Sequence, residues 1–230
     1  MRRARARILL AALAAAAALL LAGLGVWQVE RRAWKLGLIA QVERKLAAPY
    51  AAAPGPARWG TIGAADSYSR IEARGMWRRD ADTYVQALTE LGGGYWVMTP
   101  LVTPDGAILV NRGFIPPDRR GRVPVPAGVV TVRGLLRVTE PGGGFLRTND
   151  PAADRWFSRD VAAIAARHGL DRVAPYFIDA AAGTPGAWPR GGLTVVRFRN
   201  SHLVYALTWF ALAAMMTWLA VRVVREPTPR

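Results

Sequence analysis

The sequence predicts a membrane protein in which two transmembrane helices flank a mainly antiparallel β (α+β) extracytoplasmic domain with one helix. Residues 8–29 and 200–221 carry no formal charge and are mostly apolar, and no stretch between them has this character. A helix needs about 20 residues to cross the hydrocarbon core of a bilayer, so both stretches are long enough. Between them, short runs with strand character follow one another, which predicts a mainly antiparallel sheet or small barrel.

Composition narrows the classes of function. The 230 residues allow one domain of ordinary size, and 52% hydrophobic against 20% charged residues exclude wholesale disorder. The absence of Cys excludes disulfides, thiolate zinc sites, iron–sulfur ligation and Cys nucleophiles, and only two His are present. The net charge of +15 indicates an anionic partner, either nucleic acid or membrane lipid.

The first apolar stretch has two interpretations. Arg2, Arg3, Arg5 and Arg7 precede it, and Ala-x-Ala sequences occur within it, as in a cleaved signal peptide. The apolar part of a signal peptide is usually about 7–15 residues long, which is shorter than this run. A helical pattern also continues past it, so we favour an uncleaved anchor over residues 8–29 whose helix extends to about residue 46.

Two spans place both chain ends on one side of the membrane. The N-terminal Arg residues, with Arg222 and Arg225 after the second span, assign residues 1–7 and 222–230 to the cytoplasm and residues 47–199 to the periplasm. Basic residues also lie on the other side, but long loops are translocated largely regardless of charge. These are Arg31, Arg32, Lys35, Arg197 and Arg199. Trp27, Trp34 and Trp218 fit interfacial belts or, alternatively, ordinary packing.

Small residues recur along the first span. Ala14, Ala18 and Ala22 are spaced four residues apart, and Gly25 follows. Small residues at this spacing let two helices approach closely, which predicts packing against the second span. An Ala-rich span can also show such a stripe by chance.

The insert starts with a predicted linker, residues 49–60, and continues with strands bounded by Gly, Pro or Asp turn signals. The predicted strands are residues 68–74, 83–89, 95–102, 107–114, 129–138 and 176–178, the third and fourth forming a hairpin. One helix is expected with Ser158 as N-cap, Asp160 in its first turn and Gly169 at its end. The Gly triplets at residues 92–94 and 142–144 are interpreted as flexible turns, not phosphate loops.

No catalytic constellation is present, so the chain is predicted not to be an enzyme. There is no Gly-x-Ser-x-Gly or His-x-x-x-His pattern, and the paired carboxylates lie in turn-like sequence. A membrane enzyme that modifies haem or lipid therefore lacks a catalytic set. The Arg residues of the insert are scattered and not interleaved with aromatics, so we interpret them as a solvated surface and expect no nucleic-acid partner.

His202 lies at the outer start of the second stretch and can ionise near neutral pH. Ionisable residues placed in a span usually face the protein interior and mark function. On a helix, His202, Tyr205, Trp209, Leu212 and Met216 share one face, which suits an axial-ligand pocket for a haem. The alternative is an interfacial His that bonds lipid or backbone. His168 is expected to be a surface or C-cap residue.

Three motifs carry a resemblance to a known family. They are Leu24-Gly25-Val26-Trp27-Gln28 with Arg31 and Trp34-Lys35, Val110-Asn111-Arg112-Gly113-Phe114-Ile115-Pro116, and Asn200-Ser201-His202-Leu203-Val204-Tyr205-Ala206-Leu207-Thr208-Trp209-Phe210. The chain resembles the Surfeit-locus protein family over essentially its whole length. One departure is Ser201, where the family pattern has Asn.

The resemblance implies a bacterial inner-membrane assembly factor, or chaperone, for cytochrome c oxidase and related haem–copper terminal oxidases. Its implied partners are the oxidase catalytic subunit, haem A synthase and the bilayer, and its implied transient cofactor is haem A. His202 is the implied ligand of the haem iron, with Tyr205 and Trp209 lining the porphyrin. Trp27, Gln28 and Arg31 brace the helix pair or touch haem propionates, for which an Arg fork is suited. The alternative is a membrane-anchored scaffold without haem, whose insert recognises the oxidase subunit. Altering the insert, for example around residues 111–114, would then impair oxidase assembly.

Overall fold

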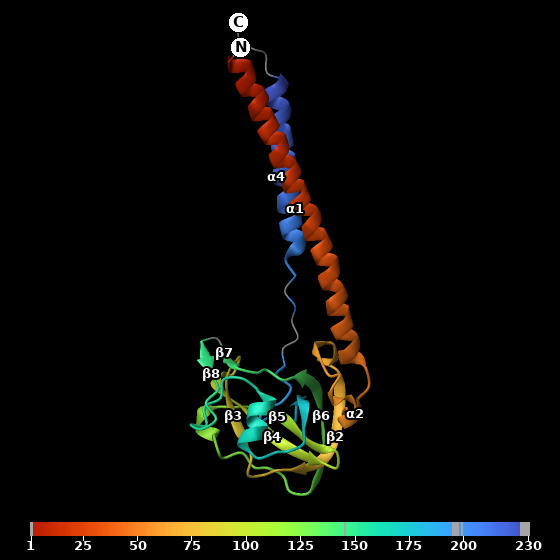
Figure 1. Cartoon of the computed structure of the whole chain (residues 1–230), viewed down its shortest axis with the longest axis vertical. Coiled ribbons are helices and arrows are strands. Elements are labelled where there is room, and N and C mark those ends of the chain that lie inside the picture. The colour runs from red at the N-terminus through yellow and green to blue at the C-terminus, as the bar shows by residue number, and fades with distance from the viewer. Residues whose placement is uncertain (1, 145, 195–197, 199, 226–230) are drawn as a thin grey trace. The chain divides into compact units, whose positions relative to one another are not determined.

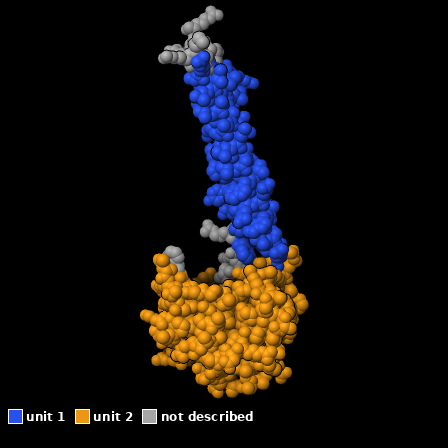
Figure 2. All heavy atoms as spheres, in the orientation of Figure 1, with its two compact units in different colours: residues 1–41, 197–230 blue, residues 42–196 orange. Residues whose placement is uncertain are grey.

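The structure is a computed structural model that describes residues 2–144, 146–194, 198 and 200–225. The predicted basic positions Arg197 and Arg199 lie outside the described residues. The chain divides into two compact units, residues 1–41 with 197–230 and residues 42–196, coloured separately in Figure 2. Each unit is described by itself below.

The first unit is an antiparallel pair of helices, α1 (Arg2–Ala47, of which residues up to 41 belong here) and α4 (His202–Arg225). The N-terminal end of α1 lies beside the C-terminal end of α4 (Figure 1), where the Arg7 guanidinium donates to the Val223 carbonyl oxygen at 2.8 Å. Both helices are long and apolar enough to cross a membrane, with mean hydropathies of 2.5 and 1.7. Only 22% and 11% of their most apolar windows are buried, unlike core helices of soluble proteins. The pair is therefore compatible with membrane anchoring.

The predicted seam of small residues lies where the two helices meet. Ala14 and Ala18 of α1 are buried, as are Ala206 and Ala213 of α4. A Cβ atom added to Gly25 would lie 2.5 Å from Cε1 of Phe210, so the second helix packs directly on this glycine. Ala22 is only half-buried. The prediction that this stripe receives the second apolar helix is confirmed.

The second unit is built on a seven-stranded sheet with the order β1-β2-β6-β9-β5-β4-β3, in which β4 also pairs with β2. This pairing closes β2, β6, β9, β5 and β4 into a barrel, and β3 extends it as a hairpin partner of β4. Most neighbours are antiparallel, but β5 and β9 are parallel, as are β1 and β2. The strands are β1 (Ala51–Ala52), β2 (Arg70–Trp77), β3 (Thr83–Thr89), β4 (Gly92–Thr103), β5 (Gly106–Ile115), β6 (Val129–Val138) and β9 (Val173–Ala180).

Alternate residues of the central strands enter different apolar clusters. In β9, Tyr176 and Ile178 belong to the cluster inside the barrel, whereas Phe177 packs outward with Trp156 and Ile164. Ile164 belongs to α3 (Val161–Arg167), which covers this outer face. Strands buried on both faces need continuous apolar runs rather than alternating ones, and β5 and β9 have such runs. The fold class predicted for the domain, mainly sheet with one helix, is confirmed.

Local details differ from the sequence prediction. The N-cap of α3 is Asp160, whose carboxylate accepts from the Ala163 amide at 3.1 Å, and not Ser158. Ser158 is instead buried and bonds the Asn149 amide at 3.0 Å. A carboxylate at this position also complements the positive end of the helix dipole, which explains the preference.

Neither glycine triplet is a turn, contrary to the prediction, because both contribute residues to strands. Residues 92–94 belong to β4, and the turn lies at Glu90 and Leu91. Residues 143–144 form β7 (Gly143–Gly144), which pairs with β8 (Arg147–Thr148) in a small hairpin. The predicted linker contains β1 and the single turn α2 (Pro56–Trp59), held because the Trp59 indole donates to the Pro54 carbonyl at 2.9 Å. Two 3₁₀ turns, η1 (Ala64–Asp66) and η2 (Pro117–Arg119), complete the described elements.

Candidate functional site

The structure joins two of the predicted site residues across the helix pair. His202, the first residue of α4, places its ring Nδ1 2.7 Å from the side-chain carbonyl Oε1 of Gln28 in α1. A carbonyl oxygen can only accept, so Nδ1 donates to it, and in the neutral ring Nε2 then keeps its lone pair. A hydrogen bond to one ring nitrogen that leaves the other free as a ligand is the usual arrangement of metal-binding histidines.

The other predicted residues surround this pair without bonding it. Trp27 and Tyr205 are 53% and 55% exposed, and Trp209 is half-buried. The Arg31 guanidinium lies over the Trp34 ring, 3.9 Å from its centroid. Two exposed aromatic residues beside a histidine offer an apolar surface to a flat ligand, and a stacked guanidinium still presents N–H groups at its edge.

A buried acceptor lies two residues before His202. The side-chain oxygen Oδ1 of Asn200 is shielded from solvent and has no hydrogen-bond partner among the described residues. Such an atom costs free energy unless a ligand or water donates to it. The described residues contain no group of three His, Cys, Asp or Glu side chains that could hold a bare metal ion. The free ring nitrogen of His202 and the unpartnered oxygen of Asn200 are therefore the polar groups that this end of the helix pair offers to a ligand.

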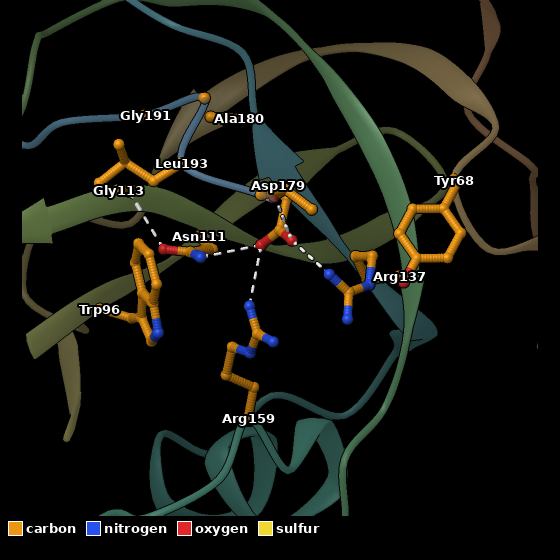
Figure 3. A pocket seen from close by; sticks show the side chains of 12 residues that line it. Tyr68, Trp96, Asn111, Gly113, Arg137, Arg159, Asp179, Ala180, Gly191 and Leu193 are labelled. Carbon is orange, nitrogen blue, oxygen red and sulfur yellow. Dashed lines mark hydrogen bonds and ion pairs between the residues drawn. The ribbon is translucent and has the colours of Figure 1, made fainter. Parts of the chain in front are cut away.

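A second polar site, which the sequence did not predict, lies in the domain. Asp179 of β9 accepts from four donors: Asn111 Nδ2 at 2.8 Å, Arg137 Nη1 at 3.0 Å, Arg159 Nη1 at 3.2 Å and Thr194 Oγ1 at 2.9 Å. Figure 3 shows the Asn111, Arg137 and Arg159 side chains converging on this carboxylate. They line a cavity of about 220 Å³ with Trp96 and Tyr68.

The charges of this cluster balance. Glu140 accepts from Arg159 at 2.6 and 2.9 Å and from Arg137 at 3.4 Å, so two guanidinium groups face two carboxylates. Burial would lower the pKa of Arg159, but Asp179 and Glu140 outweigh it and raise that pKa. A neutral, internally satisfied network stabilises one arrangement of the chain and offers no uncompensated charge to a ligand.

Residues next to the Asp179 cluster hold the segment that follows β9, residues 190–194, against β5. Gly113 adopts a φ of 129°, and a Cβ there would lie 2.3 Å from the Arg190 carbonyl oxygen. The Gly113 amide donates to the Asn111 side-chain oxygen at 3.1 Å, while the neighbouring Phe114 exchanges two backbone hydrogen bonds of 2.9 Å with Arg190. The Asn111-Arg112-Gly113 motif therefore holds residues 190–194 against the barrel.

Residues 111–114 are not an exposed docking surface. Asn111 is 4% and Phe114 0% exposed, and the Arg112 side chain is nine-tenths buried. Arg112 reaches the Pro124 carbonyl at 2.6 Å and lies 4.0 Å from Asp82. Burial lowers the pKa of Arg112, and it raises the pKa of Asp82. Altering these side chains would therefore disturb the barrel itself, and recognition of an oxidase subunit by the insert stays a prediction.

Comparison with known proteins identifies the family. The model of the SURF1 family matches residues 15–214. The chain belongs to the SURF1 family. It is 35% identical to Surfeit locus protein 1 of Rattus norvegicus and of Homo sapiens, in each case over 90% of this chain and over 73% and 75% of the relative. It is 32% identical to a SURF1-like protein of Monosiga brevicollis over 90% of this chain and 88% of the relative.

The SURF1 family match includes both sides of the His202–Gln28 contact. Gln28 and His202 lie near opposite ends of the matched range, residues 15–214. The family resemblance inferred from the motifs is thus confirmed over the helix pair and the barrel together.

Proposed function

We propose that this SURF1-family chain is a membrane-anchored assembly factor for cytochrome c oxidase that holds haem A for the catalytic subunit. The observation that carries the proposal is the hydrogen bond between His202 Nδ1 and Gln28 Oε1, which fixes the imidazole with Nε2 available to the haem iron. Haem A would bring the metal centre destined for the oxidase. His202 would bind the iron, Tyr205 and Trp209 would contact the porphyrin, and Arg31 would pair with a propionate.

In this proposal the chain lies in a bacterial inner membrane, with both ends in the cytoplasm and the barrel in the periplasm. The Arg residues that flank the cytoplasmic ends of α1 and α4 support this orientation. Haem A synthase would supply the cofactor and the oxidase catalytic subunit would receive it. The half-buried position of His202 at the first residue of α4 suits a ligand that must be released.

The test is an absorbance spectrum of the protein purified from a host that makes haem A. We expect haem A in the wild type and loss of most of it in His202→Ala. His168→Gln is the matched control, because the chain has only these two histidines, His168 lies in the barrel unit, and Gln retains a hydrogen-bonding side chain for Thr83. Its haem content should equal that of the wild type.

Gln28 provides a second readout. Gln28→Ala should weaken haem binding by about 10-fold or more, because a histidine without its hydrogen-bonded partner loses orientation and basicity. Gln28→Glu keeps an acceptor at the same place and should retain binding. Unchanged haem in His202→Ala, with normal oxidase assembly, would contradict the haem proposal and leave a scaffold that only binds the oxidase subunit.

A further inference from the structure

Two leucines of the barrel unit are more exposed than any other large hydrophobic residue that the structure describes. Leu146 is 89% and Leu88 is 88% exposed, whereas the most exposed leucine of the apolar helices, Leu19, is 76% exposed. Together with Leu91, which is 46% exposed, they form what we call the leucine patch. Large apolar side chains held in this way contribute nothing to the stability of the domain and indicate an interaction surface.

The conformation of Leu146 strengthens this point. It lies in the turn of the β7–β8 hairpin with a φ of 56°. Leucine in the left-handed region is disfavoured, and glycine or asparagine would fit such a turn better. Backbone strain of this kind clusters at functional surfaces, so the strain at Leu146 points in the same direction as its exposure.

The members of the patch come from neighbouring turns. Arg147, next to Leu146, donates to the side-chain oxygen of Gln86 at 3.0 Å, and Gln86 lies on the same face of β3 as Leu88. Leu88 and Leu91 line a depression of about 460 Å³ together with Thr89, Glu90, Trp96 and Leu193. The β3–β4 turn, the β7–β8 turn and the segment after β9 therefore border one surface.

The chain itself connects this surface to the apolar helices. Leu193 is nine residues before His202, where α4 begins, and an extended chain spans at most about 3.6 Å per residue. Within the barrel unit, β7 and β8 lie at the end of the domain from which both of its chain ends leave (Figure 1). If α4 crosses a bilayer, the distance between the leucine patch and that bilayer is limited by the length of the nine-residue segment from Leu193 to His202.

We propose that the leucine patch inserts into the interfacial layer of the same bilayer in which α1 and α4 are anchored. The inference rests on the membrane anchoring in the proposed function. Leu88, Leu91 and Leu146 enter the boundary between headgroups and acyl chains, and Arg147 remains at the level of the headgroup phosphates. Glu90, at the tip of the β3–β4 turn, limits the depth to the interface, since a carboxylate does not enter the hydrocarbon core.

The sequence permits a clean experiment because it contains no Cys. Leu88→Cys and Leu146→Cys, each in the full chain, are labelled with an environment-sensitive fluorophore and reconstituted into nanodiscs of zwitterionic lipid. Bromine atoms on the acyl chains near the headgroup then quench the label by contact. Both positions are so exposed that the substitution leaves the barrel intact, which a thermal unfolding curve checks.

Val102→Cys is the matched control. Val102 is 45% exposed and apolar, and it lies near the other end of β4, ten residues from Gly92 at the β3–β4 turn. We expect quenching at Leu88 and Leu146 to exceed quenching at Val102 by about threefold or more, as for side chains lying in the interface.

A label at Leu19, read with lipid brominated deep in the acyl chains because Leu19 lies near the middle of its span, separates this inference from the anchoring on which it rests. Quenching at Leu19 without quenching at Leu88 and Leu146 overturns the inference and keeps the anchor. No quenching at Leu19 contradicts the anchor itself. Shielding of Leu88 and Leu146 that arises only when an oxidase subunit is added assigns the patch to a protein partner and also overturns the inference.

Discussion

At the scale of single residues, His168 stabilises the barrel through its neutral form. It follows α3 as the C-cap residue, and its ring Nε2 lies 2.8 Å from Oγ1 of the buried Thr83. Burial lowers the pKa of His168, and the charges of Arg167 and Arg78 lower it further. The folded protein therefore excludes a proton that the unfolded chain accepts near pH 6.5.

This difference predicts a pH dependence of stability. A group whose folded pKa is depressed stabilises the fold above its unfolded pKa, and this contribution is lost as the pH falls below about 6.5. The melting temperature of the wild type in detergent should therefore fall between pH 7.5 and 5.5. In His168→Gln, which retains a hydrogen-bonding side chain for Thr83, the slope should flatten. An equally steep slope in the variant would assign the proton uptake to other groups.

At the scale of elements, the small-residue seam sets how closely α1 and α4 approach. Gly25 precedes Gln28 by one helical turn, so the packing of Phe210 on Gly25 also positions the amide that bonds His202. The hydroxyls of Thr208 and Thr217 donate to carbonyls of their own helix at 2.9 Å. Both hydroxyl groups are thus satisfied within α4, as they would have to be in a helix that crosses a bilayer.

The seam yields a prediction with an internal control. Gly25→Leu should separate the helices near Gln28, because its side chain would occupy the position of the Phe210 ring. Gly23→Leu should not, since nothing lies within 4 Å of a Cβ at Gly23. The measurement is the yield of a short bis-maleimide cross-link between cysteines placed at Gln28 and His202. We expect a several-fold loss with Gly25→Leu only; equal yields would show that the seam does not set the approach.

The sequence predicts elements better than it predicts where they meet. The predicted bounds of β3 and β6 equal the observed ones. These bounds depend on the alternation of apolar residues and on turn residues, which are signals between residues a few positions apart in the sequence. The Asp179 cluster depends on the register of β5 beside β9 and β9 beside β6, over separations of 68 and 42 residues. Its only local sign is a carboxylate that ends the apolar run of β9. By contrast, His202 was found because an ionisable residue in an apolar stretch is anomalous by itself.

At the scale of the whole molecule, most of the net charge lies in the helix unit, and the buried ion pairs around Asp179 lie in the barrel unit. Residues 42–196 contain 19 Arg and Lys and 14 Asp and Glu, so two thirds of the net charge of +15 belongs to the helix unit. There the positive charges flank apolar helices and accord with membrane orientation rather than with nucleic-acid binding. The barrel unit pairs its buried charges internally, around Asp179. Haem binding and domain stability should therefore respond to different substitutions.

Asp179→Asn tests this division. It leaves Arg137 and Arg159 facing Glu140 alone, and loss of one member of a buried ion cluster typically costs about 3–5 kcal/mol. Glu72→Gln is the control, because it removes only an exposed pair with Arg133, worth about 1 kcal/mol at most. We expect Asp179→Asn to lower the melting temperature and expose the barrel to limited proteolysis, while haem per folded chain stays at the wild-type level. His202→Ala should show the opposite pattern. If Asp179→Asn abolished haem binding without loss of stability, the cavity around Asp179 would have to be part of the haem site.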